Sequence, residues 1–328
     1  MSEEDRGLLE NPAARQVWNW LADRYPDRRL TPDTNLQLDL GIDSLEWVNL
    51  TFEIGQNAGM ELSEEAIGRI ATVRDLLHEV IEQAETGESA HQPSPLEHPE
   101  EVLSDEQKRW LEPLGMAESA VARVLFGLNR AIARGPFRLS VEGSEHLPEE
   151  GPLVIAPNHV SYLDAFAIAA ALDYRRLRQT YWSGWTGAAF GNPLNRLVSR
   201  LAQTIPIDPD QAIFSSLAFG AAALERGHNL VWFPEGQRSA SGEQQRFEPG
   251  IGMLLGHFRV PVVPVTIRGT YEAMPPGKAL PKPQKVTVKF GRPLDVDELQ
   301  RQGEGDQPQD RIVQALPDHV AQLLDGRE

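Results

Sequence analysis

The chain from residue 137 onward alternates short apolar runs with longer helical patterns, and this alternation limits the fold more than any other feature. Runs that suit strands occupy residues 137–141, 153–156, 179–182, 204–207, 229–233, 262–267 and 286–290. Helical patterns fill residues 163–172, 187–200, 211–226, 249–258 and 308–325. Such alternation predicts an α/β sheet covered by helices, with the chemistry placed where strands end.

One predicted strand end carries a histidine and an aspartate five positions apart. His159 and Asp164 directly follow the apolar run 153–156, in the stretch Asn-His-Val-Ser-Tyr-Leu-Asp. A neutral imidazole whose tautomer is held by a carboxylate suits a general base. Ser161 and Asp164 also fit a capping box for helix 163–172. One geometry allows both roles, with one carboxylate oxygen on a backbone amide and the second facing the imidazole.

A second motif, Phe-Pro-Glu-Gly-Gln-Arg-Ser, ends the apolar run 229–233 and presents Glu235, Gly236 and Arg238 in a loop. A guanidinium at this place suits bidentate binding of a phosphate or carboxylate. The chain has no cysteine, which excludes a thiolate nucleophile and a Cys-ligated metal. It also lacks a Gly-x-Ser-x-Gly elbow, so the pattern favours direct transfer without a covalent acyl-enzyme.

The charge of the chain is divided unevenly. Residues 1–100 hold 21 acidic residues, 7 arginines and no lysine, a net charge of −14, whereas the whole chain carries −17. Phosphates would repel so acidic a unit, which argues against a nucleic-acid partner and favours basic protein surfaces. The acidic N-terminus does not resemble a secretory signal, and no apolar run approaches the roughly 20 residues that span a bilayer. We therefore expect a cytoplasmic protein, soluble or peripheral on the inner face of the membrane.

The acidic part of the chain predicts a small bundle of four helices. Residues 11–25 begin with Asn-Pro, a typical helix start, and apolar residues recur at helical spacing from Leu45 to Ile54. Two more helices are expected near 63–69 and 73–84. A Pro-, Ser- and Glu-rich stretch then predicts a flexible linker over 87–103.

The motif Gly41-x-Asp43-Ser44-Leu45 lies between the first and second predicted helices, flanked by Glu46 and Glu53. In this context residues 10–86 resemble an acyl carrier protein. The resemblance implies that Ser44 carries a covalent 4′-phosphopantetheine arm, attached by a phosphopantetheinyl transferase and charged by an acyl-loading enzyme. It also implies that the acidic second helix docks partner enzymes. A helix N-cap at Asp43 or Ser44 is the structural alternative.

Residues 135–300 resemble the glycerolipid acyltransferases, among them the 1-acylglycerol-3-phosphate acyltransferases. The resemblance rests on the two motifs above and on the run Val-Pro-Val-Val-Pro-Val at 260–265. It implies that His159 deprotonates the acceptor hydroxyl and that Asp164 orients His159. The same resemblance makes Glu235, Gly236 and Arg238 the acceptor-binding residues.

Two positions depart from the pattern of that family. Gln237 stands where the second motif normally has Thr, and Pro209 stands where members with phosphorylated acceptors usually have Arg. Proline cannot replace that charge, and Arg196 and Arg200 are the candidate substitutes. A helical stretch before the sheet, with Arg123, Arg130 and Arg134, suits either a helix lying on an anionic bilayer or an ordinary packed helix.

The sequence thus predicts an acyl carrier domain over 1–86, a linker over 87–103 and an α/β acyltransferase domain over 104–328. The predicted activity is transfer of an acyl chain from a phosphopantetheine thioester to a hydroxyl of a lyso-glycerolipid such as 1-acylglycerol-3-phosphate. Three alternatives stay open: a non-phosphorylated or amino acceptor, a non-catalytic docking protein, and a thioesterase that releases the acid to water.

Overall fold

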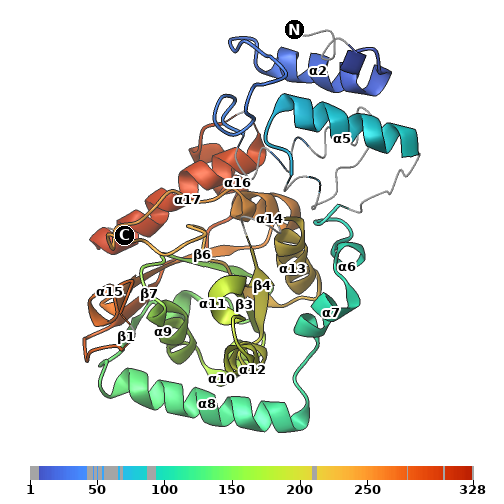
Figure 1. Cartoon of the computed structure of the whole chain (residues 1–328). Coiled ribbons are helices and arrows are strands. Elements are labelled where there is room, and N and C mark those ends of the chain that lie inside the picture. The colour runs from blue at the N-terminus through green and yellow to red at the C-terminus, as the bar shows by residue number, and fades with distance from the viewer. Residues whose placement is uncertain are drawn as a thin grey trace. The chain divides into compact units, whose positions relative to one another are not determined.

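The computed structural model describes residues 7–42, 47, 50, 54, 66, 69–86, 94–208, 213–278, 280–305 and 307–326. The chain forms two compact units (Figure 1), which we describe separately. Most of the N-terminal unit precedes residue 95, and the larger unit takes nearly all of the chain from Pro95 onward.

The N-terminal unit contains α2 (Pro12–Arg24) and α5 (Val73–Thr86). Asn11 caps α2 as expected, because its side chain accepts the N–H groups of Ala13 and Ala14 at 2.9 and 3.3 Å. The core of this unit is built from the apolar faces of the two helices and from the residues between them: Ala14, Val17, Leu21, Leu36, Leu40, Ile42, Trp47, Leu50, Ile54, Ile70, Val73, Leu76, Leu77 and Val80.

Two of the four helices predicted for this unit are therefore observed. Trp47, Leu50 and Ile54 are the described residues of the predicted second helix, and all three are buried at helical spacing. The rest of that helix, most of the helix expected at 63–69, and Ser44 itself lie outside the described residues.

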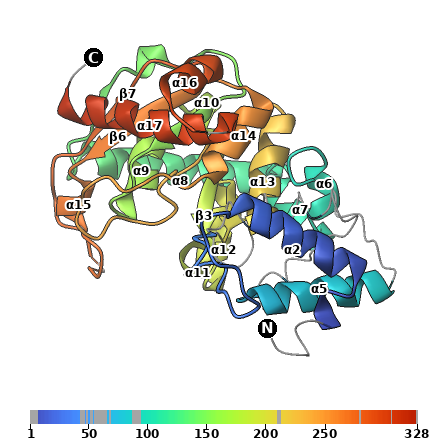
Figure 2. The ribbon, with the colours of Figure 1, turned by 90° about the horizontal axis from the view of Figure 1, so that it is seen from above.

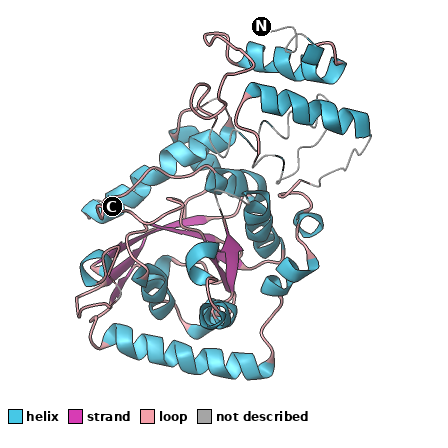
Figure 3. Cartoon of the chain, viewed as in Figure 1, coloured by secondary structure: helices cyan, strands magenta, loops and turns pink. Residues whose placement is uncertain are grey.

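The C-terminal unit is built on a seven-stranded sheet of order β1-β7-β6-β2-β5-β3-β4 (Figure 3). Its strands are β1 (Ser140–Glu142), β2 (Val154–Pro157), β3 (Thr180–Trp185), β4 (Thr204–Ile207), β5 (Asn229–Val231), β6 (Val262–Arg268) and β7 (Thr287–Phe290). All neighbours pair in parallel except β6 and β7, so the sheet is mixed. The predicted α/β class is confirmed, and each of the seven predicted strands is present.

Helices cover both faces of the sheet (Figures 1 and 2). Longer helices of this unit are α8 (Met116–Arg134), α9 (Leu163–Ala171), α12 (Pro193–Leu201), α13 (Ile213–Glu225), α14 (Gly250–Phe258), α16 (Val296–Gln302) and α17 (Pro308–Asp325). Short helical turns are α6 (Pro99–Val102), α7 (Asp105–Lys108), α10 (Tyr174–Leu177), α11 (Thr186–Ala189), α15 (Thr270–Ala273), η1 (Arg109–Leu111) and η2 (Ser144–His146). Helix α17 packs against α14, α16 and β6, whereas α8 packs against α9 and α12. None of the helices that the structure describes is both long enough and apolar enough to cross a membrane.

Two differences from the expected helices have local causes. The single helix predicted over 187–200 is divided into α11 and α12, because Asn192 adopts extended backbone angles and caps α12 through the N–H of Asn195 at 2.9 Å. The last part of the predicted linker contains α6, whose Glu100 pairs with Arg226 at 2.8 Å.

Candidate active site

The site lies where β2 and β5 end, side by side near the middle of the sheet. Parallel strands place their C-terminal ends at one edge, so the segments that follow β2 and β5 meet there. Asn158 fixes the first segment, because its buried side chain accepts the Ile267 N–H at 2.7 Å and donates to the Ile267 carbonyl at 3.2 Å. The His159 backbone carbonyl then accepts the Ser239 N–H at 2.8 Å, which joins the two predicted motifs.

The His159 imidazole and the Asp164 carboxylate form a hydrogen-bonded pair. Nδ1 of His159 lies 2.9 Å from Oδ2 of Asp164, and Asp164 is fully buried while the His159 side chain stays 18% exposed. Because a carboxylate only accepts, Nδ1 carries the proton and Nε2 keeps its lone pair. Nε2 has no hydrogen-bond partner among the described residues, so it is available to accept a proton from a substrate.

A single oxygen of Asp164 performs both of the roles considered for this residue. Oδ2 also accepts the N–H groups of Val160 at 2.7 Å and Ser161 at 2.8 Å, so it orders the turn that leads into α9. The other oxygen, Oδ1, is buried without a partner among the described residues. The expected division, with one oxygen on a backbone amide and the second on the imidazole, is therefore wrong.

The Glu235 side chain points into the protein and binds the backbone of His159. It is 2% exposed, and Oε1 accepts the His159 backbone N–H at 3.0 Å. Oε2 accepts the Gln245 backbone N–H at 3.2 Å and its side-chain amide at 3.4 Å. Burial raises the pKa of Glu235 to about 7 although these donors favour the ionised form. Both oxygens face protein donors, which makes Glu235 a positioning residue for His159.

Gly236 and Arg238 present the open side of the second motif. Gly236 has a φ of +68°, and a Cβ there would lie 3.0 Å from Cγ of Glu248, so glycine is required for this turn. The Arg238 guanidinium lies 3.5 Å from the centre of the Tyr162 ring, and Tyr162 follows His159 by three residues. Arg238 makes no ion pair with any residue that the structure describes, so its charge is free for an anionic ligand.

Three contributors to the site were not predicted from the sequence. The Tyr162 ring lies against the Arg238 guanidinium, and the Gln245 side-chain amide donates to Glu235. The Phe233 ring packs on the His159 imidazole, with ring centres 4.2 Å apart. Gln245 lies outside both motifs, ten residues after Glu235, and gives no local signal. Phe233 and Tyr162 lie inside the two motifs, so the available signal was an aromatic residue in the same motif as Arg238 or His159.

The two arginines considered as substitutes for Pro209 lie on α12. Arg200 is fully engaged, since its guanidinium donates to the carbonyls of Arg109, Glu112 and Pro113 and contacts the Glu118 carboxylate. Arg196 donates through Nε to the Phe190 carbonyl at 3.0 Å. Pro209 lies outside the described residues.

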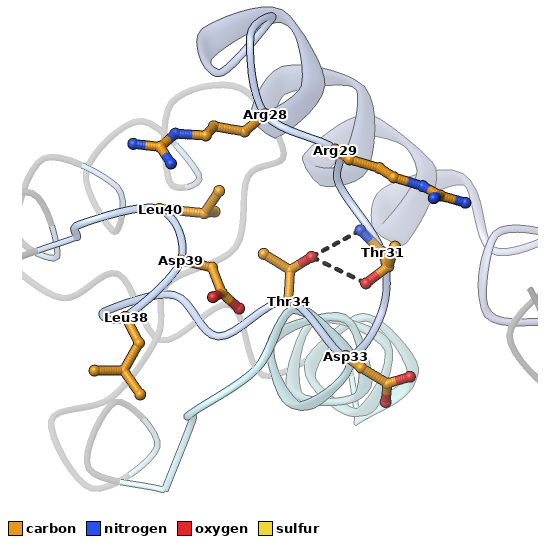
Figure 4. A pocket seen from close by; sticks show the side chains of 8 residues that line it. All are labelled: Arg28, Arg29, Thr31, Asp33, Thr34, Leu38, Asp39 and Leu40. Atoms are coloured by element: carbon orange, nitrogen blue, oxygen red, sulfur yellow. Dashed lines mark hydrogen bonds between the residues drawn. The ribbon is translucent and has the colours of Figure 1, made fainter.

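A pocket of about 370 Å³ lies in the N-terminal unit (Figure 4). It is lined by Arg28, Arg29, Thr31, Asp33, Thr34, Leu38, Asp39 and Leu40. Its two carboxylates serve the local structure, because Asp33 pairs with Arg74 and Asp39 accepts the Asn35 N–H at 2.8 Å. Each carboxylate of the pocket thus has a partner within the N-terminal unit.

Two family models match the chain. Residues 16–80 match the phosphopantetheine attachment site and residues 138–268 match the acyltransferase family. The 1-acyl-sn-glycerol-3-phosphate acyltransferase of Limnanthes alba is 28% identical over 167 residues, which is 49% of this chain and 56% of that protein. The human 1-acyl-sn-glycerol-3-phosphate acyltransferase alpha is 31% identical over 137 residues, covering 40% and 45%. The match thus spans little more than half the length of the first of these relatives.

Tafazzin of Drosophila melanogaster is 28% identical over 167 residues, covering 46% of this chain and 43% of that protein. Among solved structures, the 1-acyl-sn-glycerophosphate acyltransferase PlsC of Thermotoga maritima aligns with a TM-score of 0.49 at 22% identity. That alignment covers 64% of this chain and 84% of the other.

Proposed function

We propose, from the premise that residues 138–268 form an acyltransferase domain and residues 16–80 a phosphopantetheine attachment domain, that the chain acylates a lyso-glycerolipid. The donor is an acyl thioester on a 4′-phosphopantetheine arm attached to Ser44. The acceptor is a hydroxyl of a lipid such as 1-acylglycerol-3-phosphate. The observation that carries the proposal is the buried Asp164 holding His159 with a free Nε2, beside the unpaired charge of Arg238.

His159 acts as the general base in this reaction. Nε2 removes the proton of the acceptor hydroxyl as the oxygen bonds to the thioester carbonyl carbon. The C–S bond then breaks, and His159 returns the proton to the departing sulfur, so the ester and a free thiol are formed. Asp164 faces the imidazolium that exists between these two transfers and stabilises its charge at 2.9 Å. Positioned acid–base help of this kind contributes about 10²- to 10⁴-fold in rate.

Arg238 is proposed to bind the anionic part of the acceptor. Its guanidinium is unpaired among the described residues, and Tyr162 fixes its orientation by lying against its face. Glu235, which we expected to bind the acceptor as well, instead fixes the His159 backbone. Gly236 allows the turn that leads to Arg238.

The arm on Ser44 would supply an activated acyl group as a thioester, and the N-terminal unit would carry it. A phosphopantetheinyl transferase and an acyl-loading enzyme are the partners that this proposal requires. Since Ser44 lies outside the described residues, its attachment is tested by mass and not by geometry.

The C-terminal unit exposes an apolar face that suits a peripheral position on the inner side of the membrane. On α8, Val121, Val124 and Leu128 are 50%, 70% and 55% exposed. Leu194 and Leu197 of the neighbouring helix α12 are 68% and 55% exposed. So large a group of exposed apolar side chains is unusual for a surface that meets only water, and an acceptor lipid resides in the membrane.

The deciding experiment follows the intact mass of the acyl-loaded protein over time, with and without a panel of lyso-lipids. Loss of the acyl mass only when one acceptor is present supports transfer and identifies that acceptor. Equal loss with every acceptor and with none indicates hydrolysis and contradicts the proposal. The His159→Ala variant should keep its acyl mass, and Ser44→Ala should never gain the arm.

A further inference from the structure

Lysine is concentrated in one stretch of this acidic chain. Four of its five lysines lie between residues 278 and 289, and no acidic residue occurs between residues 274 and 292. We call residues 275–285 the lysine loop. Its Lys278, Lys282 and Lys285 are exposed, as is the nearby Arg268. None of these four side chains makes an ion pair with another described residue, so together they form a free positive surface.

The lysine loop is anchored beside the His159–Asp164 pair. The Ser161 hydroxyl, two residues after His159, donates to the Met274 carbonyl at 2.8 Å, immediately before the loop. The Lys282 N–H donates to the Ala273 carbonyl at 2.9 Å and closes the base of the loop. Four prolines within residues 275–283 stiffen it. The base of the loop is thus tied to the segment that carries His159 and Asp164.

The sheet places the loop at the same edge as the site. Strands β2 and β6 are parallel, so both end at this edge, and β7 starts there because it runs antiparallel to β6. The loop joins β6 to β7, and Arg268 at the end of β6 pairs with Thr287 at the start of β7. In both views α15 and the loop that follows it lie at one margin of the C-terminal unit (Figures 1 and 2).

We propose that the lysine loop is the docking surface for an acidic acyl-carrier domain that delivers its thioester to His159. The inference rests on the proposed function and names the surface that receives the donor. Residues 1–86, the predicted carrier, hold 18 acidic residues, 7 arginines and no lysine, a net charge of −11, so the carrier and the loop are complementary. Complementary charges at a rim raise the rate of encounter and fix the orientation of a partner.

A bilayer fits the loop less well than a carrier does. Leu280, 84% exposed, is the one exposed large apolar side chain among the described residues of the loop. Helix α8 by contrast exposes several, including Val124 and Leu128. Membrane binding depends on buried apolar area as well as charge, so α8 is the better membrane surface and the loop is left for a polar acidic partner.

The test uses two full-length copies. The donor is the His159→Ala variant with an acyl-phosphopantetheinyl group on Ser44. This group is transferred to Ser44 from acyl-coenzyme A, with loss of adenosine 3′,5′-bisphosphate. The catalyst is Ser44→Ala, which has no arm of its own, with or without the triple change K278A/K282A/K285A. Acyl-pantetheine, a donor without a protein surface, is the parallel substrate. The triple Lys→Arg variant keeps the charge, and Arg292→Ala removes an exposed charge at the other end of β7.

The triple Ala variant should lower the kcat/KM for the protein donor about tenfold at low salt, because each exposed charge pair contributes a factor of about two. Added salt should shrink the difference. The rate with acyl-pantetheine should change less than twofold, and the Lys→Arg and Arg292→Ala variants should match the parent. An effect below twofold on the protein donor, or an equal loss with both donors, would overturn the proposal.

Two further readouts separate the remaining outcomes. Loss of binding to vesicles containing anionic lipid, with normal transfer from the protein donor, would assign the loop to the membrane and reject carrier docking. If the parent catalyst transfers from neither donor, the proposed function fails. Docking is then decided by titrating the acyl-loaded donor against the catalyst, where the triple Ala change should weaken binding about tenfold, and unchanged binding would reject it.

Discussion

Replacement of Asp164 by Asn separates the two roles of this carboxylate. In the variant the amide oxygen takes the place of Oδ2 and accepts the same N–H groups of His159, Val160 and Ser161. The amide nitrogen takes the place of Oδ1, which has no partner among the described residues. The imidazole should therefore keep both its orientation and its Nδ1–H tautomer, and the change removes only the negative charge.

The expected loss follows from the 2.9 Å separation of Nδ1 and Oδ2. An ion pair at about 4 Å between charge centres is worth about 4 kcal/mol at an effective dielectric constant of about 20. A hydrogen bond to a charged partner exceeds a neutral one by about 1–2 kcal/mol. A transition-state loss of about 2–4 kcal/mol corresponds to a rate about 30- to 1,000-fold lower.

The assay is single-turnover loss of acyl mass from the loaded protein, with saturating acceptor. Circular dichroism of the same samples reports whether the turn before α9 is intact. Asp164→Ala is the comparison, because it orphans the N–H groups of Val160 and Ser161 and should lower the melting temperature as well as the rate. A folded Asp164→Asn variant within threefold of the parent rate would refute the reasoning, since Asp164 would then serve only the backbone.

Three other predictions concern the groups around this pair. The pKa of Glu235 is raised from 4.5 to about 7, so the unfolded chain loses this proton at a lower pH than the folded chain and the fold loses stability as the pH rises. Between pH 4.5 and pH 7 the free energy of unfolding should therefore fall by about 3 kcal/mol more in the parent than in Glu235→Gln, as measured by urea titrations. Equal slopes would contradict the burial effect. Tyr162→Ala should raise the acceptor KM about two- to fivefold while Tyr162→Phe preserves it, because the ring face holds Arg238; equal KM values would reject this contact as a binding aid. Val124→Asp should weaken vesicle binding about tenfold relative to Gln302→Asp on α16, and equal binding in a sedimentation assay would remove α8 from the membrane surface.

The sequence predicted local elements better than their pairing. The seven strands follow from short apolar runs between helical patterns, and His159 with Asp164 follows from spacing at a strand end. The direction of β7 and the strand order depend on contacts between distant residues, which periodicity does not report. Helix α16 was missed because its polar run Val-Asp-Glu-Leu-Gln-Arg-Gln buries only Val296 and Leu299, too few apolar positions for a clear helical repeat.

The contacts of the candidate site residues could be predicted where they are local, and could not where they depend on burial. Glu235 reads as an exposed loop carboxylate from its neighbours Pro, Gly and Gln. In the fold it accepts the backbone N–H of His159, which is 76 residues away in the chain. Gln245, in a segment without any motif, donates to the other oxygen of the Glu235 carboxylate. A carboxylate that turns inward to order a backbone gives no clear signal in sequence, because most of its donors are main-chain groups.

The remaining open feature of the site is the charge that would bind a phosphorylated acceptor. Pro209 cannot supply it, and Arg200 is held by the carbonyls of Arg109, Glu112 and Pro113 and by Glu118. Arg238 is different, because its guanidinium lies against the face of the Tyr162 ring and its N–H groups have no acceptor among the described residues. We therefore expect Arg238 to supply the charge that Pro209 lacks.

Arg238→Ala should lower kcat/KM for 1-acylglycerol-3-phosphate about 10- to 150-fold, since a charge-assisted bidentate bond is worth about 1.5–3 kcal/mol. It should leave kcat/KM for an uncharged monoacylglycerol within threefold, because that acceptor has no anion to bind. Arg238→Lys should recover only part of the loss, as an ammonium lacks the planar fork. Arg196→Ala is the matched control on α12. If Arg196→Ala produces the selective loss and Arg238→Ala does not, the phosphate lies against α12 and the second motif binds another part of the acceptor.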